Sequence, residues 1–184
     1  LETRSGILEG RDEDGLAVFR GVPFAAPPAG TRRWAPPLRE EPWRGVRDAS
    51  AIGHASPQNT SLVMRMLGLE GLAQDEDCLT LQVWTPALDA GRRPVLVWLH
   101  GGGFSNGSSQ ELKAYDGERL ARRGDVVVVS VNHRLNALGY LHLAAYGEKY
   151  ANAGNAGMLD LVLALEWVRD NVANFGGDPG NVTI

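Results

Sequence analysis

The sequence predicts an α/β fold, in which strands of a parallel sheet alternate with helices. Two apolar runs rich in valine, Val95–Leu99 and Val126–Val131, have the pattern of strands that a sheet buries on both faces. A short helical pattern over Gly117–Arg123 separates the two runs, and a longer one over Met158–Ala173 follows them. Strands and helices in this order predict a sheet with right-handed crossovers.

The N-terminal part of the chain carries different signals. Ile7–Leu8 and Leu16–Phe19 flank a charged turn that contains glycine, which predicts a β-hairpin. The proline-rich stretch 23–42 does not suit a helix or a central strand, because proline lacks the N–H that both structures need. We expect this stretch to cross the surface in an ordered way, held by Trp34 and Trp43.

The middle of the chain is less distinct. Residues 56–75 are ambiguous, and a short helix around Leu62–Leu69 is one interpretation. Leu79–Thr85 alternates apolar and polar residues, which predicts a half-exposed strand.

The helical pattern over Met158–Ala173 is apolar almost all round as far as Val168. Its first half is therefore expected to be covered on both sides by the core. Gly176 and Gly177 end the pattern. A turn follows, and Asn181–Ile184 reads as the start of another buried strand.

Composition excludes several classes of function. The hydrophobic fraction of 43% and the charged fraction of 22% are those of a soluble globular protein. A net charge of −4 with scattered arginines argues against a nucleic acid or an anionic membrane as partner. No apolar run is long enough to span a bilayer, and Leu1–Gly10 does not resemble a signal peptide. The single cysteine, Cys78, favours a reducing compartment, so we expect a cytoplasmic protein.

A glycine triplet, Gly101–Gly103, follows the first valine-rich run, between His100 and Phe104. Glycine lets successive backbone N–H groups turn toward one point and lets a ligand approach the backbone. Two donors aimed at a developing negative oxygen form an oxyanion hole. A His-Gly-Gly-Gly motif after a strand is similar to the loop that lipases and esterases use for this purpose.

Three other interpretations of the triplet compete. A dinucleotide-binding fingerprint does not fit, because the third glycine counted from Gly101 falls one place late, at Gly107. A phosphate-binding loop does not fit either, because Ser108 stands where lysine is required. A plain glycine-rich turn stays open, although turns rarely need three consecutive glycines.

The remaining polar residues suggest structural roles. No pair of histidines has the spacing of metal ligands, so no metal site is expected. His100 is expected to hydrogen-bond to the backbone under the glycine loop, and His133 to pack or to bridge polar groups. Asp160 interrupts an apolar helix and needs a partner if it is buried. We expect it to pair with Arg134.

Two residues near the strand over Leu79–Thr85 are interpreted in the same way. Glu76 is expected to form a structural ion pair with Arg33 rather than to transfer protons. Cys78 lies where the strand begins and is expected to be a small buried hydrophobic residue.

Several segments, in this order, resemble motifs of the type-B carboxylesterase family. Phe19–Gly30 resembles the opening F-x-G-I-P-[YF]-A-x-P-P-x-G, and Glu76–Pro86 resembles E-D-C-L-x-L-N-V-W-x-P. His100–Phe104 is similar to the oxyanion loop, and Asn132–Leu141 to N-Y-R-L-G-x-x-G-F-L. Gly154–Ile184 resembles the helix and strand that precede the nucleophile. The p-nitrobenzyl-esterase-like enzymes look nearest, and cholinesterases and the non-enzymatic neuroligins more distant.

The resemblance implies an α/β-hydrolase fold, of which residues 1–184 are an incomplete domain. This part holds the N-terminal hairpin and the oxyanion-loop half of a mostly parallel sheet with flanking helices. The implied activity is hydrolysis of a small-molecule carboxylic ester through a serine acyl-enzyme, without a cofactor. Gly102 and Gly103 match the oxyanion donors of the family.

The resemblance implies that the serine of the family's triad lies in F-G-E-S-x-G, directly after the strand that matches Asn181–Ile184. It also implies that the acid and the histidine of the triad lie much further along the family's chain. We therefore expect residues 1–184 alone to be inactive. The rest of the domain would come from a longer parent protein or from a second polypeptide. The alternatives are a non-catalytic binding or adhesion protein and an inactive fragment of the esterase. The intact glycine triplet favours the enzyme.

The chain departs from the family pattern at three positions. The family's early disulfide would join Cys78 to a cysteine in a C-P-Q motif, but Ser56 stands there and the bridge cannot form. His133 replaces the usual tyrosine, and Asn136 replaces the usual glycine. If that glycine has a positive φ, asparagine is the next most tolerant residue.

Overall fold

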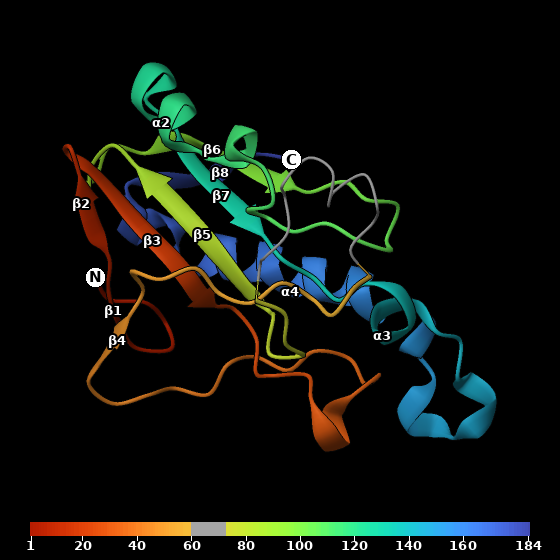
Figure 1. Ribbon diagram of the computed structural model, residues 1–184. Helices are drawn as coiled ribbons and strands as arrows, with labels where there is room; N and C mark the ends of the chain where they lie inside the picture. The colour runs from red at the N-terminus through yellow and green to blue at the C-terminus, as the bar shows by residue number, and fades with distance from the viewer. Residues whose placement is uncertain (60–72) are drawn as a thin grey trace.

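The computed structural model describes residues 1–59 and 73–184, and a six-stranded mixed sheet forms its centre (Figure 1). The strands lie in the order β2-β3-β5-β7-β6-β8, and β1 and β4 form a separate parallel pair. The strand bounds are β1 Ile7–Glu9, β2 Arg11–Glu13, β3 Leu16–Pro23, β4 Val46–Asp48, β5 Thr80–Thr85, β6 Arg93–Leu99, β7 Val127–Val131 and β8 Gly177–Thr183.

Three α-helices and several short 3-10 turns are found among the described residues. The α-helices are α2 Glu118–Gly124, α3 Asn136–Tyr140 and α4 Ala156–Asn171. Short 3-10 turns occupy Gly30–Arg32, Lys113–Tyr115, Ala144–Tyr146, Glu148–Tyr150, Ala153–Asn155 and Val172–Phe175. α2 connects β6 to β7, and α4 leads to β8, as the alternation in the sequence predicts.

The two faces of the sheet carry separate hydrophobic clusters. Val127, Val129 and Val131 of β7 belong to the larger cluster, together with residues of α4 such as Val168. The intervening Val128 belongs to the smaller cluster, which includes a residue of α2. Because successive side chains of a strand point to opposite faces, α2 and α4 cover opposite sides of the sheet.

Strand direction divides the sheet into two parts. β2, β3, β5 and β7 pair antiparallel, whereas β7, β6 and β8 are parallel. The expected α/β class with flanking helices is confirmed, and the described part of the sheet is mixed. Its parallel part places the carboxyl ends of β6 and β7 at one edge, where ligands bind in open α/β sheets.

The N-terminal expectations are confirmed in part. A hairpin is present, but its first strand is β2, which begins at Arg11 inside the predicted turn. The predicted pairing of Ile7–Leu8 with Leu16–Phe19 is wrong, because Ile7–Glu9 pairs with β4 instead. The proline-rich stretch crosses the surface, and its two tryptophans fix it to distant backbone. Trp34 Nε1 donates to Ala137 O at 3.0 Å, and Trp43 Nε1 donates to Ile7 O at 3.1 Å. The helix considered around Leu62–Leu69 lies outside the described residues.

Burial of β5 and β6 differs from the sequence prediction. β5 is almost wholly buried rather than half-exposed, because hydrogen bonds satisfy the side chains of Gln82 and Thr85 inside the protein. Gln82 Nε2 donates to Ser109 Oγ at 3.0 Å, and Thr85 Oγ1 donates to Phe175 O at 2.7 Å. β7 is buried on both faces as predicted, but Trp98 of β6 is 40% exposed.

Helix α4 and strand β8 also correct the sequence analysis. The helix ends at Asn171, and a 3-10 turn carries the chain to Gly176, whose φ of +78° stops it as predicted. The expected cover on both sides of its first half is wrong, because Met158 and Val162 are exposed on one face. β8 begins at Gly177, and its residues are mostly exposed at the edge of the described sheet.

Candidate active site

The glycine loop, residues 101–107, follows the carboxyl end of β6. Its backbone conformation is one that only glycine adopts easily. Gly102, Gly103 and Gly107 have φ values of +121°, +60° and +111°. A Cβ at Gly102 would overlap Asn106 O, and one at Gly107 would overlap Gly101 O, whereas a Cβ at Gly103 would meet nothing within 4 Å. Two of the glycines are therefore required by close packing, and the third by its dihedral angle alone.

One carbonyl group sets the direction of the Gly102 N–H. His100 Nδ1 lies 2.8 Å from Gly101 O, and since a carbonyl oxygen can only accept, Nδ1 carries the proton of this hydrogen bond. The peptide unit is planar and trans, so the N–H of Gly102 points opposite to the Gly101 carbonyl. The predicted hydrogen bond of His100 to the loop backbone is confirmed, and it turns this N–H away from the imidazole.

The next peptide unit is fixed in the same way. Gly102 O accepts hydrogen bonds from Ser105 N at 3.1 Å and Asn106 N at 3.3 Å. The N–H of Gly103 therefore points away from these donors. Gly102 and Gly103 are exposed, and among residues 1–59 and 73–184 neither N–H has an acceptor. The loop thus presents two consecutive N–H donors. The carbonyl group in the same peptide unit as each donor already accepts a hydrogen bond.

Asn136 holds the far side of the loop. Its backbone N–H donates to Phe104 O at 2.6 Å, and its side-chain Nδ2 donates to Pro57 O at 2.7 Å. Asn136 has a φ of +48°, so the residue that replaces the family's glycine does stand in the left-handed region. The ring of Phe104 packs against Tyr140 at 5.0 Å between centroids.

A buried pair of imidazoles lies beneath the loop. The rings of His100 and His133 stack with centroids 4.8 Å apart and an angle of 19° between their planes. His133 Nδ1 donates to Arg134 O at 3.0 Å, so its proton is fixed on this nitrogen as well. Burial lowers the pKa of His100 to about 4 and also lowers the pKa of His133. The ring of His133 thus packs on His100 and also bonds to a backbone carbonyl, which agrees with the packing or polar-bridging role predicted for it.

The predicted ion pairs are present. Arg134 Nη2 lies 2.6 Å from Asp160 Oδ1, and its Nε lies 2.9 Å from Oδ2, with both residues nearly inaccessible to solvent. Burial raises the pKa of Asp160, and the hydrogen bonds from Arg134 oppose that shift. Arg33 and Glu76 form a half-buried bidentate pair, with Nε to Oε2 at 2.6 Å. Both pairs are structural, as expected.

Cys78 is fully buried, as predicted for a small hydrophobic residue. Burial raises the pKa of its thiol to about 12, although the hydroxyl of Ser56 beside it acts in the opposite direction. A thiol protonated at neutral pH is a poor nucleophile.

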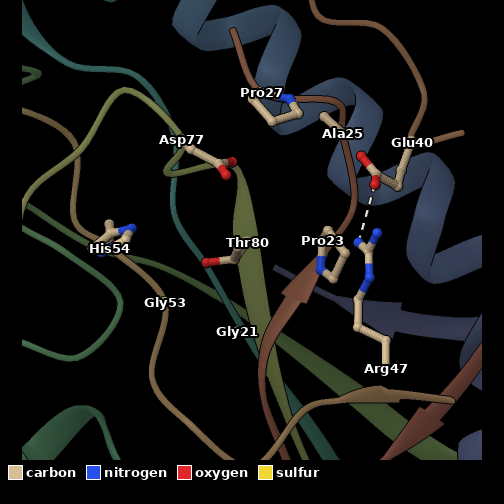
Figure 2. A pocket seen from close by; sticks show the side chains of 10 residues that line it. All are labelled: Gly21, Pro23, Ala25, Pro27, Glu40, Arg47, Gly53, His54, Asp77 and Thr80. Atoms are coloured by element: carbon tan, nitrogen blue, oxygen red, sulfur yellow. Dashed lines mark hydrogen bonds and ion pairs between the residues drawn. The ribbon is translucent and has the colours of Figure 1, made fainter. Parts of the chain in front are cut away.

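A polar hollow with a volume of about 360 Å³ lies at the ends of β3 and β5, away from the glycine loop (Figure 2). Figure 2 shows the Arg47–Glu40 ion pair on one side, where the charged atoms are 3.0 Å apart, and His54, Asp77 and Thr80 on the other. Burial, with a contribution from a neighbouring carboxylate, raises the pKa of Asp77. No glycine-loop residue lines this hollow, so it is separate from the two free donors.

Sequence reasoning did not single out Gln58, whose side chain holds the end of the glycine loop. Gly107 N donates to Gln58 Oε1 at 2.6 Å, and Gln58 Nε2 donates to Gly107 O at 2.8 Å. The two residues are 49 positions apart in the chain. No local pattern signals a contact over that separation.

In the described part of the chain, no three His, Cys, Asp or Glu side chains are grouped so that they could hold a metal ion. None of its helices combines the length and the apolar character needed to cross a membrane.

Comparisons with known proteins agree with the geometry. The model of the carboxylesterase family matches residues 1–184. The chain is 50% identical over 184 residues to phenmedipham hydrolase of Pseudarthrobacter oxydans, which covers 99% of this chain and 36% of the relative. It is 42% identical over 184 residues to para-nitrobenzyl esterase of Bacillus subtilis, covering 100% of this chain and 37% of the relative.

The crystal structure of a carboxylesterase from Geobacillus stearothermophilus superimposes with a TM-score of 0.90 at 47% identity. The match covers 100% of this chain and 36% of that structure. The chain thus spans about a third of the length of the relatives it matches. It has the α/β-hydrolase fold and belongs to the carboxylesterase family.

Proposed function

We propose that this chain carries the oxyanion loop of a serine carboxylesterase, with the N–H groups of Gly102 and Gly103 as donors. The observation that carries the proposal is the pair of consecutive N–H groups without acceptors, in a loop whose carbonyls are occupied. Two exposed N–H groups of consecutive residues, held in fixed directions by the loop, have the arrangement in which backbone donors bind a negative oxygen. Membership of the carboxylesterase family supports an ester as that ligand.

The proposed reaction is acyl transfer in two steps. A serine outside residues 1–184 attacks the ester carbonyl carbon while a histidine accepts the hydroxyl proton. The carbonyl oxygen becomes negative and accepts hydrogen bonds from Gly102 and Gly103. The intermediate expels the alcohol, which takes the proton from the histidine, and leaves an acyl-enzyme. Water then attacks the acyl carbon and releases the acid.

The names of two relatives suggest the first substrates to assay. Para-nitrobenzyl esterase and phenmedipham hydrolase match this chain from end to end. A p-nitrobenzyl ester and phenmedipham are therefore suitable starting compounds for the complete enzyme. Both are small molecules, in agreement with the composition, which argues against a polyanionic partner.

Covalent labelling tests the proposed class. Purified protein is treated with a fluorophosphonate probe, which phosphonylates an activated serine, and its intact mass is measured under denaturing conditions. A probe adduct on a polypeptide that contains residues 1–184, or on a second polypeptide that co-purifies with them, supports the serine esterase. A complete protein without an adduct and without ester turnover would favour the alternative, a non-catalytic binding protein of the same fold.

Replacing one donor tests the loop itself. Gly103→Pro removes the second N–H, and we expect kcat to fall by about 10²–10³ with a much smaller change in KM, as for the loss of one oxyanion donor. Gly103→Ala is the matched control, because it keeps the N–H and its Cβ meets nothing within 4 Å. At the φ of +60° alanine is strained, but less than proline, whose ring fixes φ at about −65°. Melting temperatures of both variants separate misfolding from lost catalysis. An unchanged kcat for Gly103→Pro would remove this loop from the mechanism.

A further inference from the structure

The side chain of Gln58 pairs with a single residue of the glycine loop through two hydrogen bonds. Its Oε1 accepts from Gly107 N at 2.6 Å, and its Nε2 donates to Gly107 O at 2.8 Å. The second hydrogen on Nε2 goes to Ser56 O at 3.0 Å. A flipped amide would place an NH₂ group against the Gly107 N–H, so the orientation of the side chain is fixed by its partners.

Gln58 is itself held firmly. Its backbone N–H donates to Gln74 Oε1 at 2.8 Å. The residues before it are fixed to the chain after β7: Leu135 N donates to Ser56 Oγ at 3.2 Å, and Asn136 Nδ2 donates to Pro57 O at 2.7 Å. The two hydrogen bonds between Gln58 and Gly107, called the Gln58 clamp below, therefore connect the loop to residues 56–58. Hydrogen bonds to other parts of the chain hold these residues in place.

Gly107 lies directly against the start of the loop. A Cβ at this position would overlap Gly101 O and would lie 2.6 Å from His100 Nδ1. The backbone of Gly107 thus closes one side of the space that holds the Gly101 carbonyl and its hydrogen bond to His100. If Gly107 moves away, that carbonyl gains room to rotate.

Rotation of the Gly101 carbonyl would rotate the Gly102 N–H with it, because both belong to one planar peptide unit. The position of Gly107 is therefore coupled to the direction of the first free donor. The coupling acts through the contact between Gly107 and the Gly101 carbonyl at the two ends of the loop. It does not require the sheet to move.

Other anchors of the loop lie on either side of Gly107. Asn136 N donates to Phe104 O at 2.6 Å, and Ser109 N donates to Asn132 Oδ1 at 2.8 Å. For residues 105–107, the side chain of Gln58 is the only hydrogen-bond partner from outside the loop among the described residues. The turn between the two anchors relies on this clamp.

We propose that Gln58 is a positioning residue of the oxyanion loop, which keeps the Gly102 N–H aimed at the substrate oxygen through Gly107. The inference rests on the proposed esterase function. Gln58 touches no reacting atom, and its effect is confined to the geometry in which the donors meet the transition state.

The test compares Gln58→Met and Gln58→Glu in the complete enzyme. Methionine keeps the length of the side chain but cannot make the two-bond pairing, and we expect kcat to fall about 10- to 100-fold with KM within about threefold. Glutamate keeps the acceptor for Gly107 N but loses the donor and places negative charge beside Gly107 O, so an intermediate loss is expected. If the methionine variant does not fold, the split between kcat and KM of the glutamate variant decides the question.

A transition-state analogue supplies a readout that a purely structural role would not change. A trifluoromethyl ketone adds to the serine and forms an oxyanion, so its affinity should fall in proportion to kcat in the Gln58 variants. Gln110→Met is the matched control, because Gln110 is a nearby glutamine whose Oε1 has no hydrogen-bond partner in the described structure. This control should keep the wild-type kcat and analogue affinity.

The outcomes separate this inference from the proposed function. A wild-type enzyme without ester turnover or probe labelling overturns the proposed function, and the positioning role with it. An active wild-type enzyme whose Gln58 variants lose melting temperature but keep kcat and analogue affinity overturns the positioning role alone. A parallel fall of kcat and analogue affinity, absent in Gln110→Met, supports it.

Discussion

The Arg134–Asp160 pair and the glycine loop differ in how completely their polar groups are hydrogen-bonded. In the pair, Arg134 donates to Asp160 through Nε, Nη2 and its backbone N–H, and its Nη1 donates to Ala35 O at 2.9 Å. In the loop, the carbonyls of Gly101, Gly102 and Gly103 accept hydrogen bonds, whereas the N–H groups of Gly102 and Gly103 have no acceptor among the described residues. Complete pairing joins α4 to the chain after β7, whereas we propose that the unpaired donors of the loop bind a ligand oxygen.

Breaking the pair should give the largest effect on stability. Asp160→Asn leaves the Arg134 charge buried without its counter-ion, so we expect the free energy of unfolding to fall by about 3–5 kcal/mol. Denaturant unfolding of the complete protein measures this loss.

Glu76→Gln is the matched control for that variant, because the Arg33–Glu76 pair is partly exposed. Its loss is expected to stay below about 1 kcal/mol. Equal losses for the two variants would mean that burial does not distinguish the pairs.

Filling the tightest point of the loop should affect activity more than stability. Gly102→Ala places a Cβ on Asn106 O at a φ of +121°, which forces the peptide units of the donors to move. We expect kcat to fall about 10²-fold, whereas Gly103→Ala should change it only a few-fold. Steady-state kinetics and melting temperatures of the two variants check this, and a similar kcat in both would show that the packing at Gly102 is not needed.

Acid should weaken the imidazole pair beneath the loop. His100 has a pKa of about 4 when folded, against 6.5 for an unperturbed histidine, so the unfolded state binds more protons between these values. Stability from this group is present at pH 7 and is lost as pH falls from about 6.5 toward 4. The loss between pH 7 and pH 5 should be about 2 kcal/mol.

Replacing the ring isolates this contribution. His100→Gln removes the titrating group but keeps a side chain that can donate to Gly101 O. Its free energy of unfolding should depend less on pH than that of the wild type over pH 5–7. A pH dependence equal to that of the wild type would assign the acid sensitivity to other groups, such as His133.

Much of the architecture follows from local sequence patterns. The run Val126–Val131 is a buried strand, and the apolar pattern after Met158 is a helix that stops at Gly176. The partners of Asp160 and Glu76 were also predictable, because a buried or half-buried carboxylate needs a cation. Burial was less predictable. β5 carries polar residues yet is buried, since Gln82 and Thr85 find partners from distant segments.

The candidate site divides in the same way. The glycine triplet, the imidazole before it and the strand that ends there can be recognised from residue type and local order alone. The hydrogen bonds from Gln58 to Gly107 and the stacking of the histidine pair beneath the loop are visible only in the folded chain. Such contacts join residues far apart in the chain, and the order and direction of the strands bring them together. Local periodicity carries no information about which distant segments will meet.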